Sequence, residues 1–518
     1  MSRRVVPTVA LALGALVLPA VAGPAAGDDD GPVVGTPQPL PAVNGWVENW
    51  RDPDFWTSYV HDALVNGELY APYPNDPVKP ESFLPNVPIA DGEYVSALPV
   101  AHEDLSGITY EYQGQTKTVE QFVRTTRTDQ VVLVRNGTVV GELYANGYSA
   151  DVRHQAWSVT KTFVAAVVGI AKGKGLVRSL QDPIDFYVPD LRGTEWEGVT
   201  LEDVLQMESG VHWDEGTPVL AVNTQVEQWR DLALDLHTDG ALGKTRNEFL
   251  VTLPSAGYEP GTRFSYNSGN TQVLAWMLER LYGKDFETIL QDELWQPMGA
   301  DGDAVMTSDR VGDVVASHGL FARPHDFARF GELLRNGGRT PEGRQVVPAD
   351  WVRAMTTMTE VSGGQYGLQT WAHPIAAPDA YTAAGFQGQK ITVMPSDCMT
   401  GVRTSHALGA DVRNGEVTDP AAYGFSVVTY EEEWQTMLRA VADALGGCRT
   451  GAGVAVPGGG AGAGASAGEG SGGSAGGAGP DVVAGRSLPA TGGTPVLVGL
   501  ALLAAAGAAA RAGRRPAS

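Results

Sequence analysis

A serine and a lysine stand three positions apart in Ser158-Val159-Thr160-Lys161, at the mouth of an apolar run rich in small residues. Positions i and i+3 share one face of a helix, so the Ser158 hydroxyl and the Lys161 ammonium are expected to meet at a first helical turn. A serine needs a neighbouring base to become a nucleophile, and a lysine can serve if burial lowers its pKa. The helix N-terminus would favour negative charge developing beside Ser158. The pattern predicts acyl transfer; a capped helix with an exposed lysine is the alternative interpretation.

The elements around this tetrapeptide begin with a β-hairpin. Residues 129–134 are expected to form a buried strand, Asn136-Gly137 is a strong hairpin-turn signal, and residues 138–144 form the returning strand. Helical and loop signals dominate from residue 180 to about residue 299, and residues 270–282 form a good amphipathic helix. The reactive serine would therefore follow a hairpin and open a buried helix.

The C-terminal half of the chain alternates between helix and strand signals. A helix is expected over residues 326–336, and a final helix is expected over residues 431–445, before the Gly446-Gly447 pair. Strands are expected over residues 367–371, 389–394 and 423–430. This layout predicts an α+β fold, with an antiparallel sheet flanked by helices and a mostly helical subdomain.

The N-terminus has the pattern of a secretory signal peptide, assigned to residues 1–26. Arg3-Arg4 precedes an apolar stretch over residues 5–21, and small residues follow, with cleavage expected near Ala22 or Ala26. A membrane anchor is the alternative. Residues 27–128 are expected to form a polar lead and a Trp- and Pro-rich extension to a main domain over residues 129–450.

The C-terminus carries a second targeting pattern over residues 488–518. Leu488-Pro489-Ala490-Thr491-Gly492 precedes an apolar segment and a tail with three arginines, and it resembles an LPxTG sorting signal. That resemblance implies cleavage after Thr491 by a sortase, covalent attachment to peptidoglycan, and a Gram-positive cell surface. Anchoring in the membrane by the C-terminal segment is the alternative. Residues 451–487 form a Gly/Ala/Ser-rich linker that would hold the domain off the wall.

Composition narrows the possible partners. The 518 residues carry a formal net charge of −24, which argues against a nucleic-acid partner. The nine histidines show no paired spacing typical of a metal site, so neither a metal nor an organic cofactor is predicted. The two cysteines, Cys398 and Cys448, could form a disulfide or remain buried thiols.

Three further motifs resemble those of class C β-lactamase-related serine hydrolases, closest to the branch of 6-aminohexanoate-dimer hydrolases and carboxylesterases. The likeness covers about residues 129–447 and rests on Leu205-Gln206-Met207-Glu208-Ser209-Gly210, Phe264-Ser265-Tyr266-Asn267-Ser268-Gly269-Asn270 and Arg323-Pro324-His325-Asp326-Phe327-Ala328-Arg329-Phe330-Gly331. It implies a β-lactamase/transpeptidase-like fold. It also implies that Tyr266 takes the serine's proton and passes it to the leaving group. A neighbouring lysine ammonium would stabilise the phenolate, whereas a core tyrosine is the alternative.

Two departures from the family pattern concern substrate recognition. Ser268 stands where β-lactamases have asparagine, as in the 6-aminohexanoate-dimer branch. The K-T-G element aligns with Ala383-Ala384-Gly385, which has no lysine or histidine to bind a substrate carboxylate. Gly385 would still permit close backbone approach. The backbone N–H groups of Ser158 and Phe386 are the expected oxyanion hole.

Together these features predict an exported serine hydrolase that cleaves an ester or amide bond of a small molecule or peptide through a Ser158 acyl-enzyme. A peptidase or amidase acting on D-amino-acid peptides or wall fragments is an alternative, disfavoured by the missing cation. The other alternative is a surface binding or sensor module that keeps the fold without turnover.

Overall fold

The computed structural model describes residues 86–126, 128–213, 245–308, 312–405, 412–413, 416–417 and 427–448. The expected signal peptide, linker and sorting signal, with Thr491, lie outside the described residues and stay predictions. Within the described ranges, no helix combines the length and the apolar character needed to cross a membrane.

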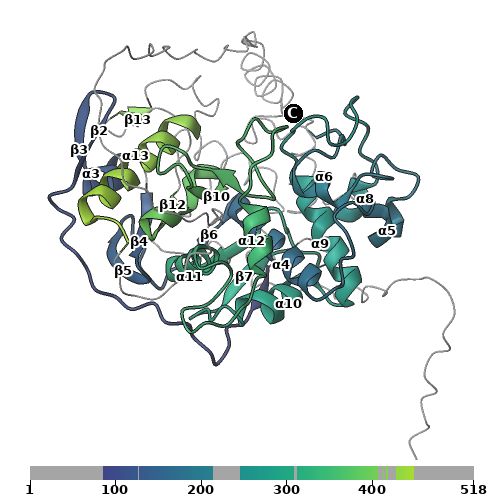
Figure 1. Ribbon diagram of the computed structural model, residues 1–518, viewed down its shortest axis with the longest axis horizontal. Coiled ribbons are helices and arrows are strands. Elements are labelled where there is room, and N and C mark those ends of the chain that lie inside the picture. Colours follow the sequence, from purple (N-terminus) through teal and green to yellow (C-terminus); the bar gives the residue numbers. More distant parts are fainter. Residues whose placement is uncertain are drawn as a thin grey trace, which may run out of the picture. The chain divides into compact units, whose positions relative to one another are not determined.

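A six-stranded antiparallel sheet forms the centre of the fold (Figure 1). In spatial order its strands are β5 (Thr138–Tyr144), β4 (Thr128–Arg135), β12 (Met399–Ser405), β11 (Gln389–Met394), β10 (Tyr381–Gly385) and β9 (Trp371–Ala372). The β4–β5 hairpin turns at Asn136 and Gly137, both with positive φ, as the turn signal predicted. Strand β4 is buried along its whole length, since both faces of the sheet are covered.

Helices cover the two faces of this sheet in separate layers. On one face lie α4 (Thr160–Gly173) and α11 (Pro324–Arg335), and on the other lie α3 (Val119–Thr125) and α13 (Val427–Leu445). Gly331 of α11 lies so close to the sheet that an added Cβ would come within 2.5 Å of Thr400. On the other face, Gly401 of the sheet makes room for Leu438 of α13. Glycine thus permits close packing on both sides.

The remaining elements form a helical part and a smaller sheet. The helices are α5 (Ile184–Tyr187), α6 (Leu201–Leu205), α8 (Arg246–Leu250), α9 (Ser268–Tyr282), α10 (Phe286–Leu290) with a π-helical turn (Gln291–Trp295), and α12 (Ala349–Met355). The smaller sheet has the order β1 (Asn86–Ile89), β7 (Ala304–Thr307), β8 (Leu320–Ala322) and β6 (His154–Gln155). Two further hairpins lie outside these sheets: β2 (Thr109–Tyr112) with β3 (Gln115–Thr118), and β13 (Val412–Arg413) with β14 (Glu416–Val417).

Residues 86–126, which the sequence assigned to an N-terminal extension, take part in these layers. Strand β1 pairs with β7. Helix α3 begins at a capping box in which Thr118 and Gln121 exchange hydrogen bonds. Phe122 of α3 is fully buried, with its ring 5.7 Å from that of Trp434 in α13.

Helix α4, which begins two residues after Ser158, is buried along most of its length. All its residues from Thr160 to Ala171 are buried, which suits its run of small and β-branched side chains. Phe163 stacks on Phe330 of α11, with ring centroids 3.7 Å apart. Burial of one such phenylalanine stabilises the fold by about 1.5–3 kcal/mol. Gly169 lies under Trp351, where a Cβ would come within 2.0 Å of the indole. This packing gives the start of α4 a fixed position.

The structure confirms the predicted strand at 389–394 and the helices at 270–282 and 326–336. The strand predicted over 367–371 is wrong, because Gly367 N–H bonds to Thr370 O at 2.9 Å and closes a turn, leaving only β9 from Trp371. The strand predicted over 423–430 is also wrong where it is described. Residues 427–430 begin α13 despite their β-branched composition, since the helix that packs on the sheet continues through them.

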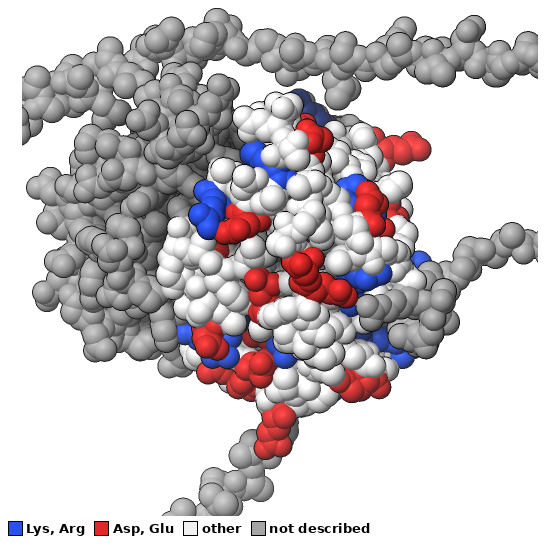
Figure 2. Space-filling model, turned by 90° about the vertical axis from the view of Figure 1, so that its left-hand side faces the viewer, with Lys and Arg blue, Asp and Glu red and all other residues white. Residues whose placement is uncertain are grey.

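Charged side chains of both signs share the face shown in Figure 2. Acidic and basic groups alternate there over the described surface, and the lysines and arginines are not gathered into one patch. Among the ion pairs of the described residues is Arg439 with Asp397, whose two contacts are both 2.8 Å.

Candidate active site

Ser158 lies in a 3₁₀ turn (Trp157–Val159) that joins β6 to α4 and leaves the serine half-buried. Trp157 has φ +49°, in the left-handed region that bulky residues rarely adopt. The Thr160 hydroxyl donates to Trp157 O at 2.7 Å. The serine therefore lies on a tight, strained turn. The regular α-helix begins at Thr160, two residues after Ser158, whereas the sequence pattern predicted that Ser158 lies in the first turn of that helix.

Lys161 approaches Ser158 as its spacing predicted. Its Nζ donates to Ser158 Oγ at 2.9 Å and to Ser317 O at 2.9 Å, and the residue is only 1% exposed. The same Nζ lies 5.0 Å from the centre of the Tyr266 ring. A buried ammonium requires such partners to offset its lost hydration. The structure thus brings Ser158, Lys161 and Tyr266 together.

Tyr266 is held at the start of α9 by the helix cap that follows it. Asn267 is the N-cap, and its Oδ1 accepts from Gly269 N at 2.8 Å. The Tyr266 ring stacks on Trp371, with centroids 5.6 Å apart, and meets the edge of Tyr366. These rings fix the direction of the phenol. Ser268, the first residue of α9, is buried beside the cap.

The motif at residues 205–210 anchors the same helix. Ser209 Oγ donates to Asn270 Oδ1 at 2.9 Å, and Asn270 Nδ2 donates to Val204 O at 3.1 Å. Glu208 accepts from Thr359, and burial raises the pKa of its carboxyl. Through these contacts with Asn270, the motif helps to position the start of α9, just after Tyr266.

The opposite side of the site is the end of strand β10. Gly385 lies against the serine turn, since an added Cβ would be 2.4 Å from Ala156 O and 3.1 Å from Trp157 Cβ. Gly385 thus allows the backbones of β10 and of the serine turn to lie in contact. Phe386 follows in a turn (Phe386–Gly388), half-buried, with its ring centroid 5.2 Å from that of Trp157.

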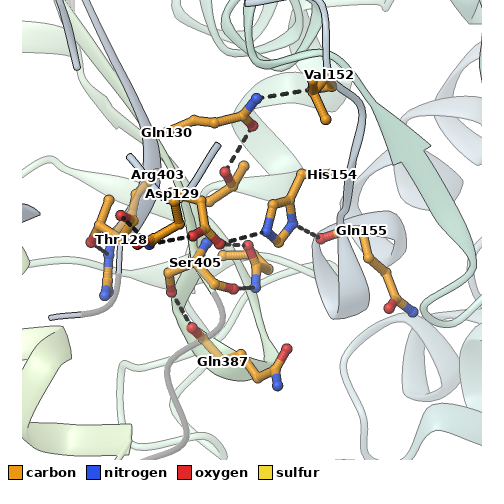
Figure 3. Close-up of polar contacts among 12 residues, drawn as sticks. Thr128, Asp129, Gln130, Val152, His154, Gln155, Gln387, Arg403 and Ser405 are labelled. Atoms are coloured by element: carbon orange, nitrogen blue, oxygen red, sulfur yellow. Dashed lines mark hydrogen bonds and ion pairs between the residues drawn. The ribbon is translucent and has the colours of Figure 1, made fainter. Parts of the chain in front are cut away.

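Hydrogen bonds from strands β11 and β12 hold that turn (Figure 3). Gln389 Nε2 donates to Phe386 O at 3.0 Å, and Gln389 Oε1 accepts from Ser405 N at 2.9 Å. Ser405 Oγ donates to Gln387 O. The backbone shape at Phe386 thus depends on side chains from two strands that follow it in the chain.

The network in Figure 3 continues from the sheet toward the serine turn. Thr404 Oγ1 donates to Gln130 Oε1 at 2.8 Å, and Gln130 Nε2 donates to Val152 O at 2.9 Å. His154 of β6 lies 3.0 Å from the buried Asp129 carboxylate. These contacts join β4 and β12 to the strand that leads into Ser158.

The cation of the K-T-G element is absent from the aligned positions, as the sequence indicated. Ala383 and Ala384 lie in β10 with methyl side chains. Lys390 pairs with Ala384 across the strands, but its Nζ binds Glu431, together with His373. Although burial acts in the opposite direction, the Lys390 ammonium and the contact with His373 hold the pKa of the Glu431 carboxyl well below its usual range.

His318 is a site residue that the sequence motifs did not reveal. Its ring stacks on Trp157 with centroids 5.7 Å apart, and its Nδ1 lies 2.8 Å from Ser317 Oγ. Burial, together with the Lys161 and Arg246 cations, lowers the pKa of His318 to about 3, so the ring is neutral at pH 7. The residue lies far from Ser158 in the sequence, in a loop without a motif of its own, so no sequence signal marked it.

No group of three His, Cys, Asp or Glu side chains among the described residues is placed to hold a metal ion. Cys398 and Cys448 form a disulfide, which settles the pairing that the sequence left open. It joins the turn between β11 and β12 to the segment after α13.

Comparison with known proteins defines the class. A family model described as Beta-lactamase matches residues 116–422, more than half of the chain, and the chain belongs to that family. A 6-aminohexanoate-dimer hydrolase from Paenarthrobacter ureafaciens is 35% identical over 309 residues, which cover 57% of this chain and 77% of the relative. The protein is thus a serine hydrolase that acts on amide or ester bonds.

A solved structure supports the fold. The structure of a proposed 6-aminohexanoate-dimer hydrolase from Bacillus anthracis superposes with a TM-score of 0.62 at 23% identity, covering 79% of this chain and 99% of that chain. The β-lactamase/transpeptidase-like α+β fold expected from the sequence is confirmed.

Proposed function

We propose that Ser158 is the nucleophile of this hydrolase, that Lys161 and Tyr266 move its proton, and that an acyl-enzyme on Ser158 is the intermediate. The single observation that carries this proposal is the placement of the Lys161 Nζ, 2.9 Å from Ser158 Oγ and 5.0 Å from the centre of the Tyr266 ring. A nucleophile and a base within hydrogen-bond reach, with a third group beside them, are the parts that covalent catalysis requires.

Acylation then proceeds by attack of Ser158 Oγ on the substrate carbonyl. A bond forms between Oγ and the carbonyl carbon while the serine's proton passes to the Lys161–Tyr266 pair. The oxyanion accepts hydrogen bonds from the N–H groups of Ser158 and Phe386. When the tetrahedral intermediate collapses, the C–O or C–N bond breaks and the stored proton goes to the leaving alcohol or amine through Tyr266.

Deacylation repeats these steps with water in place of the leaving group. A water molecule adds to the acyl carbon and gives its proton to the same pair of residues. Collapse of the second intermediate breaks the bond to Ser158 Oγ, and that oxygen regains a proton. The cycle balances without any co-reactant other than water.

The proposal is tested by labelling the full chain with a fluorophosphonate and mapping the adduct by peptide mass spectrometry. We expect an adduct on Ser158 in the wild type and none in Ser158→Ala, which should remain folded and hydrolyse no ester reporter. Turnover retained in Ser158→Ala would contradict the proposal.

For the substrate, we favour an ester or a linear amide whose acyl part carries no carboxylate near the strand β10. The absence of a cation at Ala383 supports this choice, and the name of the P. ureafaciens relative suggests the linear 6-aminohexanoate dimer as a first amide. A panel of p-nitrophenyl esters, that dimer and a D-Ala-D-Ala peptide separates the possibilities. Preference for the D-peptide would favour the peptidase on wall fragments. Labelling without turnover of any member would favour the sensor module.

We also propose that the protein is exported and joined through Thr491 to peptidoglycan by a sortase. The order of pentapeptide, apolar segment and arginine tail supports this placement. Fractionation of a Gram-positive host that expresses the full chain should recover it in the wall fraction, and deletion of residues 488–518 should release it to the medium. Recovery in the membrane fraction would support the alternative anchor.

A further inference from the structure

Trp157, directly before the proposed nucleophile, has a strained backbone. Its φ of +49° lies in the left-handed region, which for a bulky residue requires about 1–3 kcal/mol. Such a conformation persists only when the surroundings impose it. The side chain of Trp157 shows what imposes it here.

The indole of Trp157 contacts both sides of the serine turn. One face stacks on His318, with the planes 23° apart, and Phe386 meets the ring edge-on at 81°. The indole Nε1–H donates to Gln387 Oε1 at 3.2 Å. The indole therefore joins the loop that holds Lys161 through Ser317 to the turn that carries the proposed second oxyanion donor.

The turn on the other side carries a matching irregularity. Gln387 has φ +62°, so each of the two turns that face each other contains a left-handed residue other than glycine. The Trp157–Gln387 hydrogen bond links these two residues. Behind it, Gly385 brings the two backbones into contact, and Ser405 holds Gln387 O.

We infer that Trp157 is a positioning residue: its hydrogen bond to Gln387 and its edge contact with Phe386 set the spacing between the N–H groups of Ser158 and Phe386. This inference rests on the proposed function. An oxyanion hole acts only when both donors lie about 2.7–3.1 Å from the developing charge. A displacement of about 1 Å can lower the rate about a hundredfold. A side chain that joins the two turns can therefore affect the rate by changing the distance between them.

The test is a double-mutant cycle with Trp157→Phe and Gln387→Met, which remove the donor and the acceptor while keeping much of the bulk. Because a neutral hydrogen bond contributes about 0.5–1.5 kcal/mol, each single variant should lower kcat/KM by about 2- to 13-fold, with KM nearly unchanged. Affinity for phenylboronic acid, a tetrahedral analogue, should fall in parallel. The kcat/KM of the double variant should be no lower than that of the less active single variant, since both substitutions remove the same hydrogen bond.

The matched control is Trp295→Phe. The Trp295 indole also donates to an oxygen, Gly302 O at 3.0 Å, in the buried core. This variant should lose stability and keep the wild-type kcat/KM. Thermal unfolding of every variant shows whether it is folded, and rates are compared per folded molecule.

Three outcomes would overturn the inference. They are strictly additive losses in the cycle, wild-type kcat/KM and boronate affinity in Trp157→Phe, or an equal loss in Trp295→Phe. If Ser158 of the wild type is labelled by the fluorophosphonate, any of these outcomes leaves the proposed function standing. Absence of that label in the wild type overturns both proposals together.

Discussion

The two sides of the Ser158 turn are built in different ways. The side with the proposed proton-handling groups consists of helix starts, where Lys161 follows Ser158 by three residues and Tyr266 precedes the Asn267 cap. The proposed oxyanion side is the end of β10, whose turn is held by side chains of Gln389 and Ser405. The first side depends on local spacing, and the second depends on pairing between strands.

This contrast separates two kinds of information. Helical spacing brings two side chains together wherever the helix lies, so its chemistry can be recognised in a short motif. The path of the backbone at Gly385 and Phe386 depends on strand register and on the neighbouring serine turn. A substitution should therefore act on the chemistry at the first side and on geometry at the second.

The largest effect is expected on the helix side. Lys161→Met should lower kcat/KM by about 10²–10⁴-fold, since it removes one of the two groups proposed to move the serine's proton while keeping an apolar stem of similar length. Initial rates with an ester reporter, together with fluorophosphonate labelling, measure the loss. Lys390→Met, another buried lysine, is the matched control and should reduce stability more than activity. Equal losses of kcat/KM in the two variants would contradict a special role for Lys161.

Gly385→Ala should distort the backbone on the proposed oxyanion side. The new methyl group would lie 2.4 Å from Ala156 O, so the strand must move away from the serine turn. We expect stability to fall by about 1–3 kcal/mol and kcat/KM to fall about a hundredfold. Gly107→Ala is the control, because a Cβ added at Gly107 would have no heavy atom within 4 Å apart from those of its two neighbours in the chain. Near-wild-type kinetics in Gly385→Ala would show that the contact does not matter for catalysis.

The disulfide should affect stability without affecting the site. Cys398 lies next to the turn between β11 and β12, at the other end of that hairpin from Gln389 and Ser405. Replacement of both cysteines by serine should lower the free energy of unfolding by about 2–4 kcal/mol, with kcat/KM changed less than about twofold. Urea unfolding and initial rates test both statements, and wild-type protein in reductant is the parallel sample. A tenfold loss of kcat/KM would show coupling along the hairpin.

The smallest effect concerns His318 and acid. Its pKa is lowered from 6.5 to about 3 in the folded state. Between these two pH values, His318 is therefore protonated in the unfolded chain and neutral in the folded chain. Stability should thus fall as the pH decreases from 6.5 toward 3, by at most about 1.4 kcal/mol per pH unit for this group. Urea unfolding at pH 6.5 and 5 should show a smaller drop in His318→Gln than in the wild type. Identical drops would contradict the assignment.

Local sequence patterns predicted the β4–β5 hairpin, α9, α11 and the meeting of Ser158 with Lys161. They failed for residues 427–430, where tertiary packing extends α13, and they did not reveal β12. That strand contains Thr400, Gly401 and Arg403, and it is a strand because β4 and β11 pair with both of its edges. His318 was missed for a related reason, since its role arises from the ring of Trp157 that it meets in space.

The amino-acid sequence by itself determined the groups that could carry out the chemistry, because three-residue spacing on a helix and a capped helix start are local physical relations. It also determined the family likeness and the absence of a cation at Ala383-Ala384. Only the tertiary structure decided how Trp157, Gly385 and Gln387 meet and which loop carbonyl receives Lys161. Those contacts join segments distant in the chain, and their geometry depends on the packing of the whole sheet against its helices.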